Sequence, residues 1–200
     1  MPRTILVSLF GDLGDTILTI PALRAVRNRY PDARIVLLGK SVAADYATGL
    51  RLVDECIVVD KHAFDRPASL FSPSAWLSLA TLLFRLRRRR PDTVLIFHHL
   101  PTLWGSLKFA LLSLASGAQC RLGLDNGRGW FLTKAVRDRG FGALHEAEYW
   151  LQVAELLDAT GPLKLEAPIT DDDRVRANRL LPSTELFGVH PGTGLSLIHI

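Results

Sequence analysis

Short apolar runs, mostly separated by helical patterns, constrain the fold of this sequence more than any other feature. Each run has the length of a strand buried on both faces and ends in glycine, proline or polar residues. Strands of this kind, joined through helices, form a parallel sheet that helices cover on both sides. We therefore predict an α/β, Rossmann-like fold with at least five parallel strands and the first strand in the centre. The predicted strands are residues 4–9, 34–38, 56–59, 93–97 and 120–124.

Helical patterns fill most of the intervals between these runs. The pattern at residues 73–90 is amphipathic and ends before Pro91. Its predicted inward-facing residues are Trp76, Leu79, Leu83 and Leu86. One further helix is predicted after the first strand and its turn, and it ends at Tyr30. Two more are predicted at residues 101–116 and 144–159.

A change of pattern after Gly161 predicts a domain boundary. Thr170 and Asp173 have the spacing of a capping box, which predicts a helix that ends near Leu181. A second apolar run followed by a glycine turn then repeats the unit that opens the chain. We therefore predict a first domain at 1–165, a linker and helix at 166–182, and the start of a second domain at 183–200. The last segment is expected to be poorly ordered, because a lone strand cannot bury both faces.

Charge and cysteine content narrow the function classes. The net charge is +4, and five arginines lie between positions 85 and 90. A basic balance is compatible with nucleic acid, a membrane surface or a phosphorylated substrate. RNA-binding and zinc-finger signatures are absent, so we do not expect a nucleic-acid partner. The two cysteines lack metal-site or disulfide spacing. With no apparent signal peptide and no apolar run of spanning length, we predict a soluble cytoplasmic protein.

The turn after the first strand, residues 10–15, is the first candidate site, because ligands bind beyond the carboxyl ends of parallel strands. The turn matches neither the dinucleotide fingerprint nor the phosphate loop of ATPases, and no acidic residue ends the second strand. It carries Asp12 and Asp15. Asp15 is predicted either to cap the first helix or to act as a general base, and the two roles are compatible. Asp12 is expected to face solvent.

Four further groups of polar residues are candidates with an open alternative. His98 and His99 end the fourth strand and are either structural or ligand-binding, and no third metal ligand accompanies them. Arg121 and Arg128 flank a glycine-containing turn and are candidate anion contacts. His145 either caps its helix or binds a ligand. The arginines at 85–90 are either a solvated helix end or a contact for anionic lipid.

Four stretches, in order along the chain, resemble glycosyltransferase family 9, which includes the heptosyltransferases of lipopolysaccharide core assembly. The opening stretch GDTILTIPAL follows the first strand, and RLGLDNGRG, HEAEY and GVHPGTG follow further along. They occupy residues 14–23, 121–129, 145–149 and 188–194. The resemblance covers residues 3–194. After it, residues 195–200 lack the lysine and the tryptophan–proline pair that are usual in the family, and we interpret them as non-native.

The resemblance implies a two-domain GT-B architecture, with the acceptor bound to the N-terminal half and a nucleotide-sugar, in many members ADP-heptose, bound to the C-terminal half. It implies an inverting reaction without metal or cofactor, with Asp15 as the catalytic base. The acceptor would be a lipid-linked saccharide, with peripheral contact to the cytoplasmic face of the inner membrane. The chain alone is expected to be inactive. The implied acceptor-binding residues are Gly14, His98, His99, Arg121, Arg128 and His145, and the donor phosphate would bind Gly192, Thr193 and Gly194.

Two other functions stay open at this point. One is a nucleotide-binding Rossmann module of an oxidoreductase, against which the missing fingerprint argues. The other is a non-catalytic saccharide-binding module.

Overall fold

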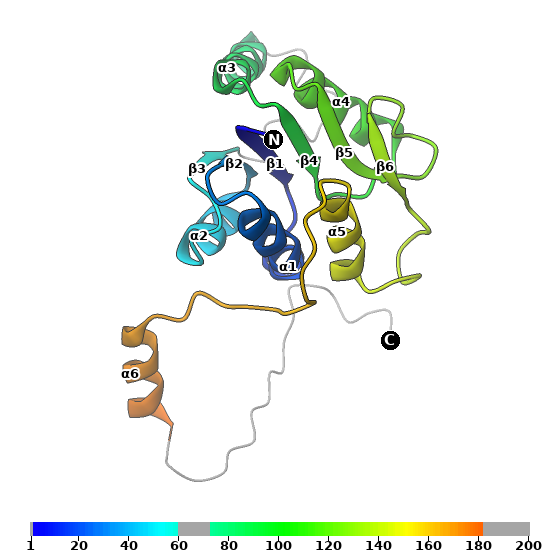
Figure 1. Cartoon of the computed structure of the whole chain (residues 1–200). Helices are drawn as coiled ribbons and strands as arrows, with labels where there is room; N and C mark the ends of the chain where they lie inside the picture. The colour runs from blue at the N-terminus through cyan, green and yellow to red at the C-terminus, as the bar shows by residue number, and fades with distance from the viewer. Residues whose placement is uncertain (1, 60–72, 182–200) are drawn as a thin grey trace, which may run out of the picture. The chain divides into compact units, whose positions relative to one another are not determined.

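A computed structural model describes residues 2–59 and 73–181 of the chain. It divides the chain into two compact units, residues 1–168 and 169–200. The first unit is a sheet with helices on both faces, as Figure 1 shows. The strands are β1 (Thr4–Leu9), β2 (Arg34–Gly39), β3 (Glu55–Val58), β4 (Thr93–Ile96), β5 (Cys120–Asp125) and β6 (Lys134–Arg137). The helices are α1 (Leu13–Arg29), α2 (Ser41–Gly49), α3 (Pro73–Arg89), α4 (Leu103–Ser116), α5 (Glu146–Glu155) and α6 (Asp171–Leu180).

The described strands form one sheet in the order β3-β2-β1-β4-β5-β6. All of its pairings are parallel, with Ile5 beside Ile35 on one side of β1 and beside Thr93 on the other. The predicted α/β class, the parallel strands and the central first strand are therefore confirmed. Because the strands are parallel, all of their carboxyl ends lie along one edge of the sheet, which we call the carboxyl edge.

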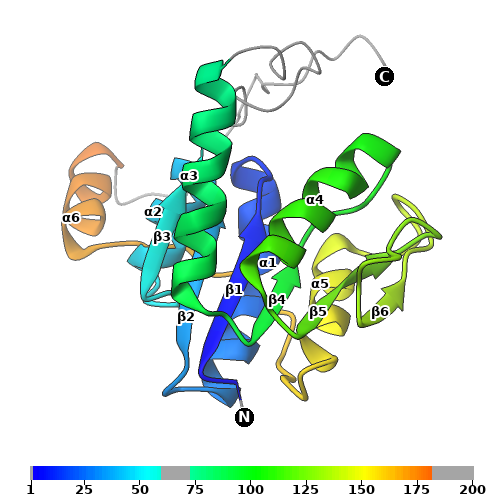
Figure 2. The same ribbon diagram turned by 90° about the horizontal axis from the view of Figure 1, so that it is seen from above.

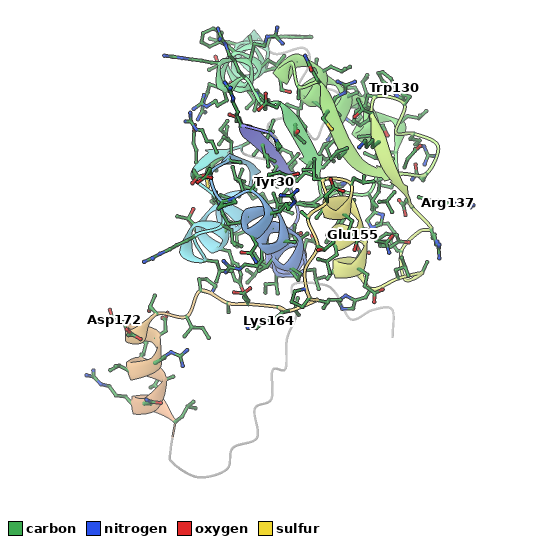
Figure 3. All side chains as sticks on the ribbon, in the orientation of Figure 1. Tyr30, Trp130, Arg137, Glu155, Lys164 and Asp172 are labelled. Carbon is green, nitrogen blue, oxygen red and sulfur yellow. The ribbon has the colours of Figure 1, made fainter. Side chains whose placement is uncertain are left out.

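Two apolar cores lie on the two faces of the sheet. Helices α1, α2 and α5 cover one face, where Ile5, Val7 and Leu37 are buried. Helices α3 and α4 cover the other face, where Leu6, Val36 and Ile96 are buried. Figure 2 shows α3 and α4 side by side over the sheet. Side chains fill the space between the layers (Figure 3). Alternate residues of β1 thus face opposite cores, which explains its continuous apolar run.

Gly39 shows why the second strand ends in a glycine. A Cβ atom at this position would lie 2.1 Å from the carbonyl oxygen of Leu9 on β1. Any larger residue would push the paired ends of β1 and β2 apart. This glycine therefore lets the carboxyl ends of β1 and β2 pair closely.

Two elements and one side-chain orientation differ from the sequence-based predictions. Helix α2 and strand β6 were not predicted. The predicted inward position of Trp76 is wrong, since this side chain is 55% exposed, whereas Leu82 and Leu86 are buried. The exposed apolar residues of α3 therefore need another explanation.

The second unit is described only through α6. Thr170 Oγ1 accepts the backbone N–H of Asp173 at 3.1 Å, and Asp173 Oδ2 accepts that of Thr170 at 2.9 Å. This confirms the predicted capping box. Residues 182–200 lie outside the described residues. They include the apolar run predicted to open the second domain and the candidate donor site Gly192, Thr193 and Gly194. Among the described residues, no helix is both long enough and apolar enough to cross a membrane.

Candidate active site

The carboxyl edge of the sheet brings together most of the side chains predicted to bind ligands. Gly14 and Asp15 follow β1, and His98 and His99 follow β4. Arg128 follows β5, and His145 precedes α5. Arg121 is the exception, because it lies near the amino end of β5, beside Val94 of β4.

Asp15 lies in the first turn of α1, one turn beyond the central strand. The prediction that it is the N-cap is wrong, since α1 begins at Leu13 and the N-cap is Asp12. Asp15 occupies the third helical position instead, and its Oδ2 accepts the backbone N–H of Asp12 at 2.9 Å. A Cβ atom on Gly11 would lie 2.2 Å from Asp15 Cβ. The glycine before the helix is therefore what lets the Asp15 side chain fold back over the turn.

This arrangement leaves Asp15 available for chemistry. The residue is exposed, and within the described ranges its Oδ1 has no hydrogen-bond partner. One oxygen is thus fixed by the backbone while the other can accept a proton from a ligand. An unpartnered carboxylate oxygen within reach of a ligand hydroxyl is what a general base needs.

Asp12 differs from Asp15 in its partner. Its side chain is 86% exposed, as predicted, and it pairs with the ammonium group of Lys40 after β2. The two carboxylates of the turn are therefore distinguishable, and Asp12 is a suitable control for Asp15.

Gly14 lies in the same helical turn and has no packing role. A Cβ atom here would meet no atom within 4 Å. The fold therefore does not demand a glycine at this position, in contrast to Gly11 and Gly39. An unobstructed backbone beside Asp15 leaves room for a ligand to approach.

His99 is the centre of a buried polar cluster. Its Nδ1 lies 2.9 Å from Asp138 Oδ2, and its Nε2 lies 3.0 Å from Glu146 Oε2. The side chains of His99 and Asp138 are 6% and 4% exposed. The ring also packs against Phe141 and Tyr149. The cluster joins β4, β6 and the start of α5, and so fixes the loop that borders the carboxyl edge.

The two carboxylates determine the charge of His99. Burial lowers the pKa of its imidazole, but hydrogen bonds and charge attraction from Asp138 and Glu146 outweigh burial and raise the pKa above its ordinary value of 6.5. The carboxylates lie on opposite ring nitrogens rather than around one point. Among the described residues no group of side chains forms a metal site.

The raised pKa of His99 predicts that the protein loses stability in alkaline solution. The folded state binds this proton more tightly than the unfolded state, so the stabilisation is complete below the ordinary pKa of 6.5 and disappears as pH rises through the raised value. Denaturant unfolding between about pH 6 and about pH 9 should show this loss, and His99→Gln should show a flatter profile. Equal profiles for the two proteins would mean that His99 is not charged in the folded state.

The turn after β5 owes its shape to Asp125. Its Oδ1 accepts the backbone N–H groups of Gly127 at 2.8 Å and Gly129 at 2.7 Å. Gly127 has a φ of +95°, a conformation that side chains rarely adopt. These contacts account for the aspartate and glycines of this motif. Arg128 lies between the two glycines, half-buried, and makes no hydrogen bond or ion pair within the described ranges.

Arg121, which was predicted with Arg128 as a candidate anion contact, does not lie at the carboxyl edge. Arg121 donates from Nε to Phe131 O and from Nη1 to Ala118 O, each at 2.7 Å. These bonds tie the loop before β6 to the start of β5. The physical reason is strand direction, because Arg121 is the second of the six residues of β5 and so lies at the end of the strand opposite the carboxyl edge.

The other two candidate histidines, His98 and His145, have partners that are close to them in the sequence. The exposed His145 is the N-cap of α5, and its Nδ1 accepts the backbone N–H of Ala147 at 3.3 Å. This confirms the capping alternative. His98 Nδ1 contacts the backbone oxygen of His99, and its ring packs on Phe109 at 4.9 Å.

Comparison with solved structures identifies similar proteins. A glycosyl transferase family 9 protein from Veillonella parvula is 25% identical with a TM-score of 0.64, over 92% of this chain and 51% of that one. Escherichia coli heptosyltransferase WaaC, solved with ADP-2-deoxy-2-fluoro heptose, is 16% identical with a TM-score of 0.66, over 80% of this chain and 50% of that one. E. coli ADP-heptose lipopolysaccharide heptosyltransferase II is 19% identical with a TM-score of 0.57, over 90% and 51%.

No family model and no curated protein sequence matches the chain. The chain spans about half the length of the solved proteins it matches. Over that half, the fold agrees with the resemblance that the four motifs predicted. The structural comparison therefore confirms the similarity of this chain to glycosyltransferase family 9.

Proposed function

We propose that this chain is the acceptor-binding half of an inverting glycosyltransferase in which Asp15 is the general base. The observation that carries the proposal is the Asp15 carboxylate, exposed at the carboxyl edge beyond the central strand with one oxygen held by the backbone and the other unpartnered among the described residues. Ligands of open parallel sheets bind at this edge.

The proposed reaction needs a base because a sugar hydroxyl is a poor nucleophile. The hydroxyl oxygen of the acceptor attacks the anomeric carbon of a nucleotide-sugar and passes its proton to Asp15 Oδ1. The bond from the anomeric carbon to the nucleoside diphosphate breaks, and the diphosphate leaves with the bonding electrons. Attack from the side opposite the leaving group inverts the anomeric centre. No step uses a metal ion or a cofactor.

The proposed substrates follow from the proteins of similar fold. One of them was solved with a fluorinated ADP-heptose and another is named as an ADP-heptose lipopolysaccharide heptosyltransferase. We accordingly propose ADP-heptose as donor, with its phosphates at Gly192, Thr193 and Gly194. The proposed acceptor is a lipid-linked saccharide of the lipopolysaccharide core, and we propose that the enzyme works in the cytoplasm beside the inner membrane.

The proposed acceptor site uses Gly14, Arg128 and the loops that His98, His99 and His145 hold in place. Arg128 is the proposed contact for an acceptor phosphate or carboxylate, because it lies at the carboxyl edge and has no partner among the described residues. Arg121 has two backbone partners instead.

The pair of arginines gives a direct test of the acceptor site. Arg128→Ala should weaken binding of a phosphorylated core saccharide by roughly ten- to a hundredfold, the value of a charge-assisted hydrogen bond. Arg121→Ala is the matched control, which should lower the melting temperature and leave acceptor affinity within about threefold. Calorimetric titration of each variant with acceptor measures the two affinities, and thermal unfolding measures the melting temperature. Unchanged affinity in Arg128→Ala would remove this residue from the site.

The same titration, together with a transfer assay on the complete enzyme, separates the proposal from the other functions. NAD that binds in place of the saccharide would indicate an oxidoreductase module. Saccharide binding without any transfer by the complete enzyme would indicate a non-catalytic module.

A further inference from the structure

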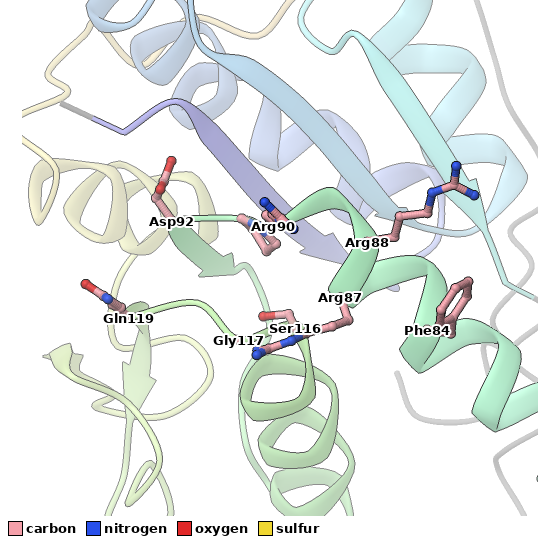
Figure 4. A pocket seen from close by; sticks show the side chains of 9 residues that line it. Phe84, Arg87, Arg88, Arg90, Asp92, Ser116, Gly117 and Gln119 are labelled. Atoms are coloured by element: carbon pink, nitrogen blue, oxygen red, sulfur yellow. The ribbon is translucent and has the colours of Figure 1, made fainter.

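A concavity lies at the edge of the sheet opposite the carboxyl edge, on which Asp15 lies. It has a volume of about 960 Å³ and lies where α3 and α4 end, before β4 and β5. Figure 4 shows Arg87, Arg88 and Arg90 around it. Nothing in the proposed sugar transfer uses this concavity.

The three arginines outnumber the single carboxylate of the concavity and give it a net positive charge. Within the described part of the chain none of the three has a carboxylate partner, whereas Arg89 between them pairs with Glu55. Asp92 also lines the concavity, but its Oδ2 already accepts the backbone N–H groups of Arg3 and Thr4 at 2.7 and 2.9 Å. The backbone carbonyls at the ends of α3 and α4 offset only part of this charge.

Gly117 provides the space that the Arg87 side chain occupies. A Cβ atom on Gly117 would lie 1.7 Å from Arg87 Nη1, and the residue has a φ of +82°. The glycine that ends α4 therefore lets a guanidinium group of α3 lie directly over the turn. This places Arg87 at the concavity rather than free in solvent.

The same two helices carry an exposed apolar surface. Leu103, Leu107, Leu111 and Leu114 follow one stripe of α4, and Leu103 is 76% exposed. On α3, Leu77 and Phe84 are 71% and 66% exposed. Phe84 also lines the concavity, so the apolar and basic regions are continuous. Large exposed apolar side chains beside basic ones are typical of an interaction site.

We propose that the α3–α4 surface docks on an anionic phospholipid bilayer. The arginines of the concavity take lipid phosphates, and the leucines and Phe84 enter the headgroup layer beside them. The combination of leucine and phenylalanine with arginine fits an anionic membrane interface, because apolar burial and attraction to lipid phosphate then act together. A soluble anion would use the arginines alone and would leave the apolar stripe unexplained. The inference rests on the proposed function for the membrane as partner and adds the surface that touches it. Vesicle binding can fail while sugar transfer is retained, so the two proposals are tested separately.

Sedimentation with sucrose-loaded vesicles tests this proposal. The chain should bind phosphatidylcholine vesicles that contain about 30% phosphatidylglycerol, and should bind pure phosphatidylcholine at least about tenfold less. The triple variant R87Q/R88Q/R90Q should weaken partition by about a hundredfold, since each basic residue near an anionic surface strengthens binding roughly fivefold. L107Q/L111Q should weaken it by about tenfold or more.

The matched control removes the same charge elsewhere. R174Q/R176Q/R179Q changes three exposed arginines of α6 and should alter partition by less than about threefold. If the R87Q triple variant fails the folding check by circular dichroism, Arg88→Gln alone should still show about a fivefold loss.

Three results would overturn the proposal. One is equal loss in the two triple variants, which would indicate net charge rather than a surface. Another is displacement from vesicles by millimolar inorganic phosphate, which would indicate a soluble anion as the ligand. The third is a dimer that L107Q/L111Q converts to monomer in a chain that does not bind vesicles, which would assign the surface to a second copy.

Discussion

Asp15→Asn in the complete enzyme is expected to lower the rate of sugar transfer by about 10²–10⁴-fold, the usual contribution of a general base. Asparagine has nearly the size of aspartate but cannot take a proton. Its side-chain oxygen can still accept the backbone N–H of Asp12, so the turn before α1 should keep its shape. The melting temperature should therefore change little while transfer is lost.

Two further variants separate catalysis from helix capping. Asp15→Ala removes the carboxylate and the contact with Asp12, so it should cost about 1 kcal/mol of stability in addition to activity. Asp12→Asn is the control, because Asp12 lies in the same turn but pairs with Lys40. Its transfer rate should stay near that of the parent enzyme. Near-parent transfer in Asp15→Asn, or a larger loss in Asp12→Asn, would move the base to another residue.

His99→Leu should destabilise the fold by about 3–5 kcal/mol, the cost of removing one member of a buried ionic cluster. The variant leaves the carboxylate of Asp138, which is 4% exposed, without its imidazole partner. Glu146 loses its partner at the start of α5 as well. Denaturant titration at about pH 6, where His99 is charged, measures this cost.

Two comparisons make the His99 experiment specific. His145→Ala removes an exposed N-cap of the same helix α5 and should cost only about 1 kcal/mol. H99L/D138N should recover part of the loss, because asparagine carries no charge and can still accept the N–H of Gly140 that Asp138 Oδ1 now accepts. A cost below about 1 kcal/mol in His99→Leu would show that the cluster does not hold the carboxyl edge together.

The sequence predicted the sheet because its strands are buried on both faces. Continuous apolar runs such as Thr4–Leu9 have few other structural uses, and their alternation with helices implies parallel pairing. Strand β6 was missed because its residues are exposed or half-buried and include two charges. Helix α2 was missed because its N-cap is Lys40, which is not a favoured capping residue.

The candidate site was predictable only where its signals are local in sequence. Asp15 was identified from the turn that holds it, although its helix begins earlier than expected. Asp138 and Glu146 were missed because they lie 39 and 47 residues from His99, and no spacing rule links them. Arg121 was grouped with Arg128 because the two flank a glycine-containing turn in the sequence. Counting along β5 would have separated them, because a strand carries its two ends to opposite edges of the sheet.

The most direct test of the proposed function is the product that the complete enzyme forms from a labelled nucleotide-heptose. The proposal predicts that the labelled sugar moves to the hydroxyl of a core saccharide with inversion at the anomeric carbon. It also predicts that a chelator leaves the rate unchanged and that Asp15→Asn lowers the rate by about 10²–10⁴-fold. Nuclear magnetic resonance of the product gives the anomeric configuration. Retention of configuration would contradict an inverting glycosyltransferase with Asp15 as its base. So would a parent enzyme that transfers no sugar and instead moves a labelled hydride from NADH.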